Sequence, residues 1–136
     1  MATRIEYDAR YLAGIRHFNQ GEYFEAHEVW EDLWGECEPS DRRFYQSLIQ
    51  AAVALYHCSR GNATGAHRLF HSGRRYMKPY RPVHLGLEID SFWKMMEARL
   101  GPVVLNEKAP VTGDASTPMP RIALYPEPAQ DASSPP

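Results

Sequence analysis

The stretch Gly21-Glu-Tyr-Phe-Glu-Ala-His-Glu-Val-Trp-Glu-Asp-Leu-Trp34 decides the fold and holds the first candidate site. Its spacing predicts a helix that carries His27 and Glu31 one turn apart, beside two tryptophans. A His and a Glu placed in this way can share a metal, a proton or a hydrogen bond. Polar groups beside large aromatic side chains are costly to leave unpaired. The sequence therefore predicts polar chemistry at the edge of a helical core.

Apolar residues recur at helical spacing through the first hundred residues, and glycine, proline and capping residues divide them into five helices. The third is apolar nearly all round, which indicates a buried central helix. The first predicted helix follows Asp8 as N-cap, the second runs from about Glu22 to Trp34, and the third runs from about Asp41 to Arg60 with Ser40 as its cap. The fourth extends from Asn62 to Pro79, and the fifth runs from near Ser91 to Gly101.

A weak internal repeat links the first and second halves of this region. Gly21, Ala26, His27 and Trp30 recur forty positions later as Gly61, Ala66, His67 and Phe70. In each case a glycine turn joins two helices and an alanine allows close approach, as in tetratricopeptide units. We predict an all-α domain over residues 1–101, a compact bundle of about five helices built from two stacked, tetratricopeptide-like hairpins plus a closing helix.

The composition changes at Pro102. Residues 102–136 hold eight of the eleven prolines and few large apolar residues, which predicts a mostly disordered tail. The segment Arg121-Ile-Ala-Leu-Tyr125 departs from this composition and could dock on the bundle in extended form. A wholly unstructured tail with incidental aliphatic residues is the alternative.

Composition excludes several classes of protein. The chain has 136 residues, 43% apolar residues and a formal net charge of −2, as expected for one globular domain without general attraction to nucleic acid. Cys37 and Cys58 lack metal-binding spacing and indicate reduced thiols. No leader or membrane span is apparent. We expect a soluble, cytoplasmic protein of undetermined oligomeric state.

The candidate site follows from pairing the second and third helices as antiparallel neighbours. That pairing sets His27 opposite Gln50 and Glu31 opposite Gln46, and Gln46, Gln50 and His57 share one stripe of an otherwise apolar helix. Polar groups from both helices would then meet beside the core. The candidate ligand-binding residues are His27, Glu31, Gln50, His57 and, more weakly, Glu28, which points further toward solvent.

Several interpretations of this convergence stay open. A satisfied network that only fixes helix register is slightly favoured over a ligand site. His27, Glu31 and His57 could instead bind a divalent transition metal such as zinc, manganese or iron, although no His-Glu-x-x-His or Glu-x-x-His motif is present. A binding domain for a small ligand or metal is the leading function. A metal-assisted, hydrolase-like enzyme with Glu31 as general base and a helical adaptor for a protein partner are the alternatives.

The fourth predicted helix has one basic side. A phosphate or an acidic partner could bind there, but a solvated face balanced by acids of the second helix is the favoured interpretation. This basic side consists of His67, Arg68, His71, Arg74, Arg75 and Lys78, continued by Arg81.

Three segments together carry a family resemblance. They are Phe18-Asn-Gln-Gly-Glu-Tyr-Phe-Glu-Ala-His-Glu-Val-Trp-Glu-Asp-Leu-Trp34, Phe44-Tyr-Gln-Ser-Leu-Ile-Gln-Ala-Ala-Val-Ala-Leu-Tyr-His57 and the Gly61-Asn-x-x-Gly-Ala-x-Arg-Leu69 pattern. Over about residues 7–100 the chain resembles the family catalogued as domain of unknown function 309. The resemblance implies a small all-helical bundle and no particular activity. It places Glu25, His27, Glu28, Glu31, Gln50 and His57 at the family's polar positions.

Overall fold

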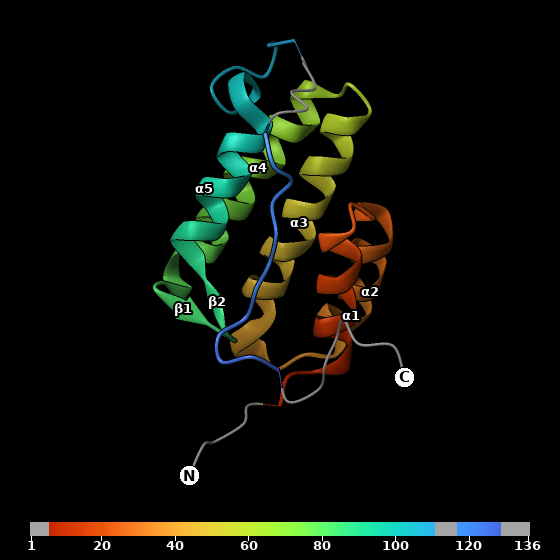
Figure 1. Ribbon diagram of the computed structural model, residues 1–136, viewed down its shortest axis with the longest axis vertical. Helices are drawn as coiled ribbons and strands as arrows, with labels where there is room; N and C mark the ends of the chain where they lie inside the picture. Colours follow the sequence, from red (N-terminus) through yellow and green to blue (C-terminus); the bar gives the residue numbers. More distant parts are fainter. Residues whose placement is uncertain (1–5, 111–116, 129–136) are drawn as a thin grey trace.

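The computed structural model describes residues 6–110 and 117–128 and contains five α-helices (Figure 1). They are α1 (Ala9–Asn19), α2 (Tyr23–Glu36), α3 (Arg42–Ser59), α4 (Ala63–Met77) and α5 (Ile89–Leu100). This confirms the predicted all-α class, whereas tetratricopeptide-like stacking stays a prediction. Within the described ranges, none of these helices has the length and apolar character needed to cross a bilayer.

Short elements connect the helices. The 3-10 turns are η1 (Pro39–Asp41), η2 (Lys78–Tyr80) and η3 (Gly101–Val104). A small antiparallel hairpin, β1 (Val83–His84) with β2 (Leu87–Glu88), stands between η2 and α5 and pairs Val83 with Glu88. The sequence did not predict this hairpin.

Helix α3 is the central helix, as predicted, because α2 and α4 both pack against it. Phe44, Leu48 and Ala51 on α3 are fully buried. Helices α3 and α5 approach α4 closely at Gly73 of α4, where an added Cβ would lie 2.8 Å from the Trp93 ring of α5. The Ser47 hydroxyl donates to the Gly73 carbonyl across the same contact. The α3–α4–α5 packing is therefore tight and leaves no room for a side chain at position 73.

The two glycine turns predicted from the internal repeat have the same geometry. Gly21 and Gly61 both have φ of +77°, a left-handed conformation that glycine adopts without steric cost. In each turn the residue after the glycine donates its N–H to a carbonyl five residues back, from Glu22 to His17 at 2.9 Å and from Asn62 to His57 at 2.8 Å. The sequence repeat therefore corresponds to a repeated helix-ending turn.

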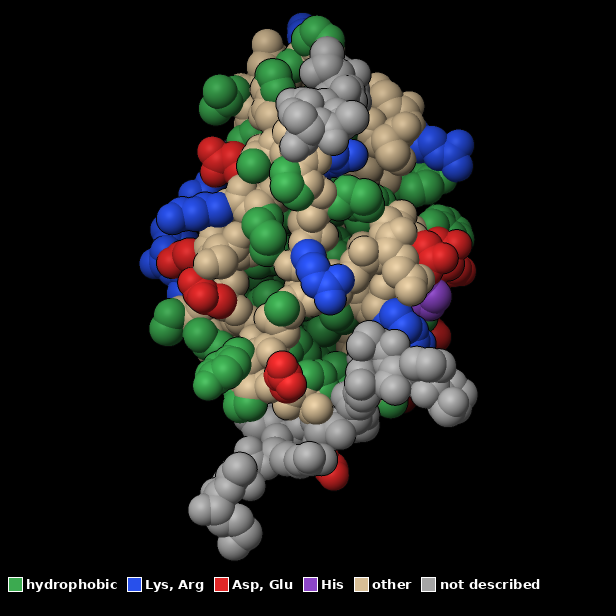
Figure 2. All heavy atoms as spheres, viewed as in Figure 1, with side chains coloured by type: hydrophobic (Ala, Val, Ile, Leu, Met, Phe, Trp, Pro, Cys, Tyr) green, Lys and Arg blue, Asp and Glu red, His purple; other side chains and the backbone are tan. Residues whose placement is uncertain are grey.

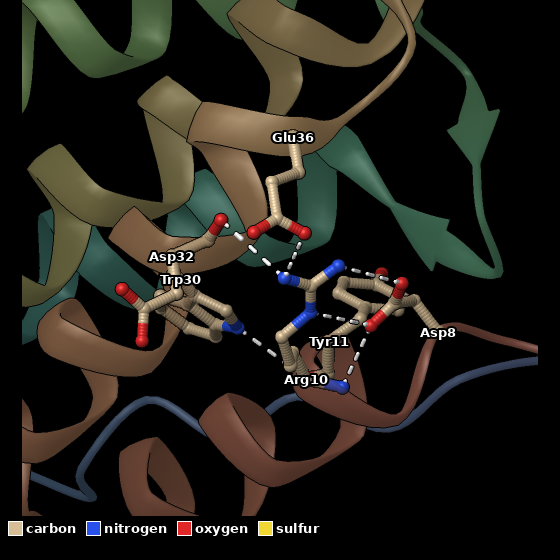
Figure 3. A network of polar contacts seen from close by, with 6 residues as sticks. All are labelled: Asp8, Arg10, Tyr11, Trp30, Asp32 and Glu36. Carbon is tan, nitrogen blue, oxygen red and sulfur yellow. Dashed lines mark hydrogen bonds and ion pairs between the residues drawn. The ribbon is translucent and has the colours of Figure 1, made fainter.

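A polar network at one end of the bundle holds α1 against α2 (Figure 3). Arg10 donates through Nη1 to Glu36 Oε2 at 2.9 Å and through Nε to Asp8 Oδ1 at 3.3 Å. Next to Arg10, the indole Nε1 of Trp30 donates to the Tyr11 carbonyl at 3.3 Å. The Arg10 pairs are exposed and contribute little stability, whereas the buried indole fixes how closely the two helices approach.

The helix caps predicted from the sequence are confirmed only in part. Asp8 accepts from the Arg10 N–H at 2.8 Å and Asn62 accepts from the Gly65 N–H at 2.9 Å, so both predicted caps are confirmed. Ser40 does not cap the third helix, because Pro39 begins a 3-10 turn and Asp41 occupies the N-cap position without a side-chain bond. Helix α5 begins at Ile89, two residues before the predicted Ser91.

The described part of the tail lies on the bundle. Residues 117–128, drawn in blue, run along its length between α5 and α1 (Figure 1). Pro120, Ile122 and Leu124 are buried there, and Val103 and Val104 of η3 also belong to the core. Residues 111–116 and 129–136, which were predicted to be disordered, lie outside the described residues.

Candidate functional site

The recess nearest the predicted site lies between α2 and α3. The two helices are antiparallel, with the Phe24 and Tyr56 ring centroids 5.9 Å apart. His27 and His57 both line the recess, as sequence reasoning expected, but Val53 and not Gln50 accompanies them. Its volume is about 130 Å³, and its lining residues are Tyr23, Phe24, His27, Val53, Tyr56 and His57.

Both ring nitrogens of His27 face oxygen atoms. Nδ1 donates to the Phe24 carbonyl at 2.9 Å, and Nε2 lies 3.3 Å from Glu31 Oε1. Glu31 is itself about half exposed (55%). A ring nitrogen that binds a metal needs a free lone pair, so these contacts suit a hydrogen-bonded imidazole better than a ligand.

His57 and Gln50 have other surroundings. The Asn62 amide donates to His57 Nδ1 at 3.2 Å, inside the turn that begins α4. Gln50 faces α4, because its Cβ lies against Gly73, and its buried Oε1 has no hydrogen-bond partner among the described residues. The predicted pairing of His27 with Gln50 is not found among the hydrogen bonds of the described residues, because the His27 nitrogens face the Phe24 carbonyl and Glu31 instead.

The predicted metal ligands do not assemble into a centre. Among residues 6–110 and 117–128, no three His, Cys, Asp or Glu side chains are grouped so that they could hold a metal ion. His27, Glu31 and His57 therefore do not form such a group as the fold places them. Glu28 is exposed, as predicted.

A larger concavity lies elsewhere, between α4 and α5. This α4–α5 cavity has a volume of about 280 Å³. Helical spacing aligns the α4 residues, because positions 71, 74, 75 and 78 recur at three- and four-residue steps. Figure 2 shows Lys and Arg side chains at the edge of the molecule where α4 and α5 lie, with Asp and Glu side chains beside them. The lining residues are His71, Arg74, Arg75, Lys78, Arg81, Ile89, Asp90 and Trp93.

The charges around this cavity are unbalanced. Four Lys and Arg side chains line it against one carboxylate, Asp90, although the whole chain carries a formal charge of −2. Asp90 lies 3.6 Å from Arg81, while Arg74 and Lys78 form no ion pair with the described residues. No ion pair with an acid of α2 is found for this basic face among the described residues, and Glu31 and Glu36 pair with His27 and Arg10.

Contacts around the cavity fix its walls. His71 donates through Nε2 to the Val104 carbonyl of η3 at 2.6 Å. The buried Trp93 donates through Nε1 to Met77 Sδ at 3.2 Å. Hydrogen bonds with Ser72, Arg43 and Arg75 lower the pKa of the neighbouring Tyr76, as expected beside a concentration of positive charge.

Sequence reasoning identified the basic face but not the α5 residues that make it concave. Ile89, Asp90 and Trp93 complete the cavity from a second helix. The available signal was the apolar stripe of the fifth helix, which predicts packing but not which neighbour it packs against.

Comparison with known proteins finds a match over part of the chain to a family without a described function. The model of the family described as "Domain of unknown function (DUF309)" matches residues 11–69, which confirms the resemblance over that stretch. YpuF of Bacillus subtilis (strain 168), an uncharacterized protein, is 40% identical over 80 residues, or 57% of this chain and 46% of YpuF. An uncharacterized protein of Aquifex aeolicus (strain VF5) is 37% identical over 46 residues, or 33% of this chain and 14% of that protein. The chain thus spans less than half the length of these relatives. No solved structure matches it significantly.

Proposed function

We propose, since the family matched by residues 11–69 has no described function, that this protein is a binding domain for a small, multiply charged anion. The binding site is the α4–α5 cavity. The observation that carries the proposal is the unpaired positive charge in a concave site: Arg74 and Lys78 form no ion pair with the described residues, and the one carboxylate of the lining, Asp90, already lies beside Arg81.

The chemistry of these side chains favours phosphate groups over single carboxylates. A guanidinium offers paired donors that match two oxygens of one phosphate, and an ammonium adds a point charge. Several such groups around one concavity neutralise several negative charges at once. A cavity of about 280 Å³ lies just below the usual range for ligand sites, which suits a compact phosphate compound.

A solvated basic face is the competing interpretation, and the geometry argues against it. Such a face would be flat and evenly surrounded by solvent or counter-charges. Here the cations surround a hollow whose floor is formed by the buried Ile89 and Trp93. Charges beside a low-dielectric wall attract an anion more strongly than charges on an open surface.

Calorimetric titration with pyrophosphate at 150 mM NaCl tests the proposal. The double variant Arg74→Ala, Lys78→Ala should bind at least tenfold more weakly than the wild type. Arg68→Ala removes an exposed charge from the same helix outside the cavity and should bind as the wild type does. An equal loss in both variants would mean diffuse attraction to the helix, and no binding by the wild type would refute the proposal.

The α2–α3 recess is a second candidate, for a small ligand, because His27 and His57 share it. Its volume is less than half that of the α4–α5 cavity, and the contacts of His27 are already made. The hydrolase-like alternative would use Glu31 as general base, paired with His27. We rank both below anion binding.

The cytoplasmic location expected from the sequence also stays a proposal. Its support is that Cys37 and Cys58 are unpaired thiols, both partly buried. Free thiols of this kind are usual in reducing compartments.

A further inference from the structure

Two arginines converge on one tyrosine at the surface between α3 and α4. The guanidinium carbon of Arg43, on α3, lies 4.3 Å from the centre of the Tyr76 ring, and that of Arg75, on α4, lies 5.4 Å from it. Hydrogen bonds join both guanidinium groups to the Tyr76 phenol. Both arginines are exposed, and the tyrosine is partly buried. We call these three residues the tyrosine–arginine cluster.

The packing of α3 on α4 brings this cluster together. The two helices lie side by side (Figure 1), and the Ser47 hydroxyl of α3 donates to the Gly73 carbonyl of α4. Arg43 precedes Ser47 by about one turn, and Tyr76 follows Gly73 by about one turn. The antiparallel register therefore places Arg43 against Tyr76. The Arg43 guanidinium is also held by Gln46, whose Oε1 accepts from Nη1 at 3.3 Å.

The cluster contains two positive charges and no carboxylate. Among the residues that the structure describes, neither Arg43 nor Arg75 forms an ion pair with Asp or Glu. Asp41 is the acid nearest to Arg43 along the chain, but its Oδ1 lies 2.8 Å from His84 Nε2. Two guanidinium groups that share one phenol repel each other, and water only weakens that repulsion. An anion bound between them would remove it.

Arg75 connects the cluster with the α4–α5 cavity. It is one of the residues that line the cavity, whereas Arg43 and Tyr76 are not. Successive residues of a helix point in directions about 100° apart, so Arg75 stands between the cavity on one side and Tyr76 on the other. Positive side chains therefore continue without a break from Arg74 and Lys78 in the cavity, past Arg75, to Arg43 on α3.

We propose that the anion bound by this protein is a linear chain of at least three linked phosphate groups. One end of the chain fills the α4–α5 cavity, and the other passes Arg75 and ends at the tyrosine–arginine cluster. This inference rests on the proposed function and adds to it the class of ligand. Arg74 and Lys78 bind the phosphates in the cavity, and Arg43 binds the last phosphate beside the Tyr76 phenol.

A chain of linked phosphates suits this row of side chains better than other anions do. Each phosphate carries charge and offers oxygens to the planar donor pairs of a guanidinium, so consecutive phosphates can bind consecutive arginines. A single phosphate would reach only one end of the row. An acidic peptide carries its charges on flexible side chains, each of which loses rotamer freedom on binding.

Calorimetric titration in the absence of divalent cations compares pyrophosphate with tripolyphosphate on the full chain. Tripolyphosphate should bind the wild type roughly tenfold more tightly, as expected from one further hydrogen bond to a charged group. In Arg43→Ala this gain should disappear. Pyrophosphate, which does not reach Arg43, should bind this variant as it binds the wild type. Arg43 is exposed, so we expect the variant to melt as the wild type does.

Arg42→Ala is the matched control, because it removes the same charge from the neighbouring position of α3. The Arg42 guanidinium carbon lies 3.9 Å from the centre of the Trp34 ring of α2, away from the cluster. Tripolyphosphate should therefore keep its gain over pyrophosphate in this variant. An equal loss in Arg42→Ala and Arg43→Ala would mean diffuse attraction and overturn the proposal, as would a gain that survives in Arg43→Ala.

The outcomes separate this inference from the proposed function. Absence of binding by both phosphates would refute the anion site and the chain together. Binding of pyrophosphate with no gain from tripolyphosphate would leave the anion site standing and overturn the chain. A hexaglutamate peptide that binds as tightly as tripolyphosphate, and equally depends on Arg43, would overturn the assignment to phosphate.

Adenosine triphosphate distinguishes the sources of the chain, because a nucleoside blocks one of its ends. Binding at least as tight as that of tripolyphosphate would assign the chain to a nucleotide, and weaker binding would assign it to inorganic polyphosphate. The tighter ligand should raise the pKa of Tyr76, since added negative charge disfavours the phenolate. The difference in phenolate absorbance between the wild type and Tyr76→Phe measures this pKa. An unchanged pKa of Tyr76 with the ligand bound would place the chain elsewhere and overturn the proposal.

Discussion

The substitution Gly14→Ala tests the packing of α1 on α2 most directly. An added Cβ on Gly14 would overlap Nε1 and Cδ1 of the Trp30 indole. Trp30 is fully buried, and its Nε1 donates to the Tyr11 carbonyl at 3.3 Å. Because a buried indole cannot swing into solvent, either the ring or the helix must move.

The expected cost follows from three contributions. Overpacking a well-packed core costs about 1–3 kcal/mol, and losing the indole hydrogen bond adds about 1 kcal/mol. Replacing a helical glycine by alanine returns about 1 kcal/mol. The free energy of unfolding should therefore fall by roughly 1–3 kcal/mol. For a chain of this size this corresponds to a melting temperature lower by roughly 3–10 °C.

Urea unfolding followed by far-UV circular dichroism measures this change, and Gly35→Ala is the matched control. Gly35 is also helical, in α2, but nothing lies within 4 Å of its added Cβ. The control should be unchanged or more stable by at most about 1 kcal/mol. A Gly14→Ala variant as stable as the wild type, with unchanged tryptophan fluorescence, would refute the packing argument.

Two further predictions concern protons and metals. Burial raises the pKa of Tyr11 and Tyr45 above the ordinary value of 10, so both phenols favour folding while protonated. Their stabilisation should be fully present below pH 10 and be lost as pH rises toward the folded pKa values; urea midpoints from pH 8 to 11 measure the loss, and Tyr45→Phe should reduce its slope. Added zinc should shift the melting temperature equally in the wild type and in the double variant His27→Ala, His57→Ala, because no metal group assembles there. A larger shift of the melting temperature in the wild type would support a metal site at His27 and His57.

Local sequence signals account for the helices that were predicted correctly. Asp8 and Asn62 cap through their own side chains, and Gly21 and Gly61 end helices through their own φ angles. Each of these features depends on a few neighbouring residues. The hairpin before α5 has only two residues in each strand, too few for an alternating pattern to appear.

The candidate site was harder to predict because it depends on how helices rotate against one another. A helical wheel groups Gln50 with His57 correctly as one stripe, but it does not say which neighbour that stripe faces. In the structure this stripe lies against the glycines of α4, Gln50 against Gly73 and His57 against Gly65, and His57 also lines the recess beside His27. The α4–α5 cavity likewise needs Trp93, which belongs to another helix and has no local relation to Arg74.

The strongest polar signal in the sequence and the best binding geometry therefore lie on different helices, for a physical reason. Next to aromatic side chains, His27 must satisfy its nitrogens locally, and it does so with the Phe24 carbonyl and Glu31. A polar group satisfied in this way has little capacity left for a ligand. Arg74 and Lys78 can remain unpaired because they lie at the surface, where water solvates them. The residues of the proposed anion site thus have the sequence pattern of an ordinary solvated face, and only the concavity made by α5 distinguishes them.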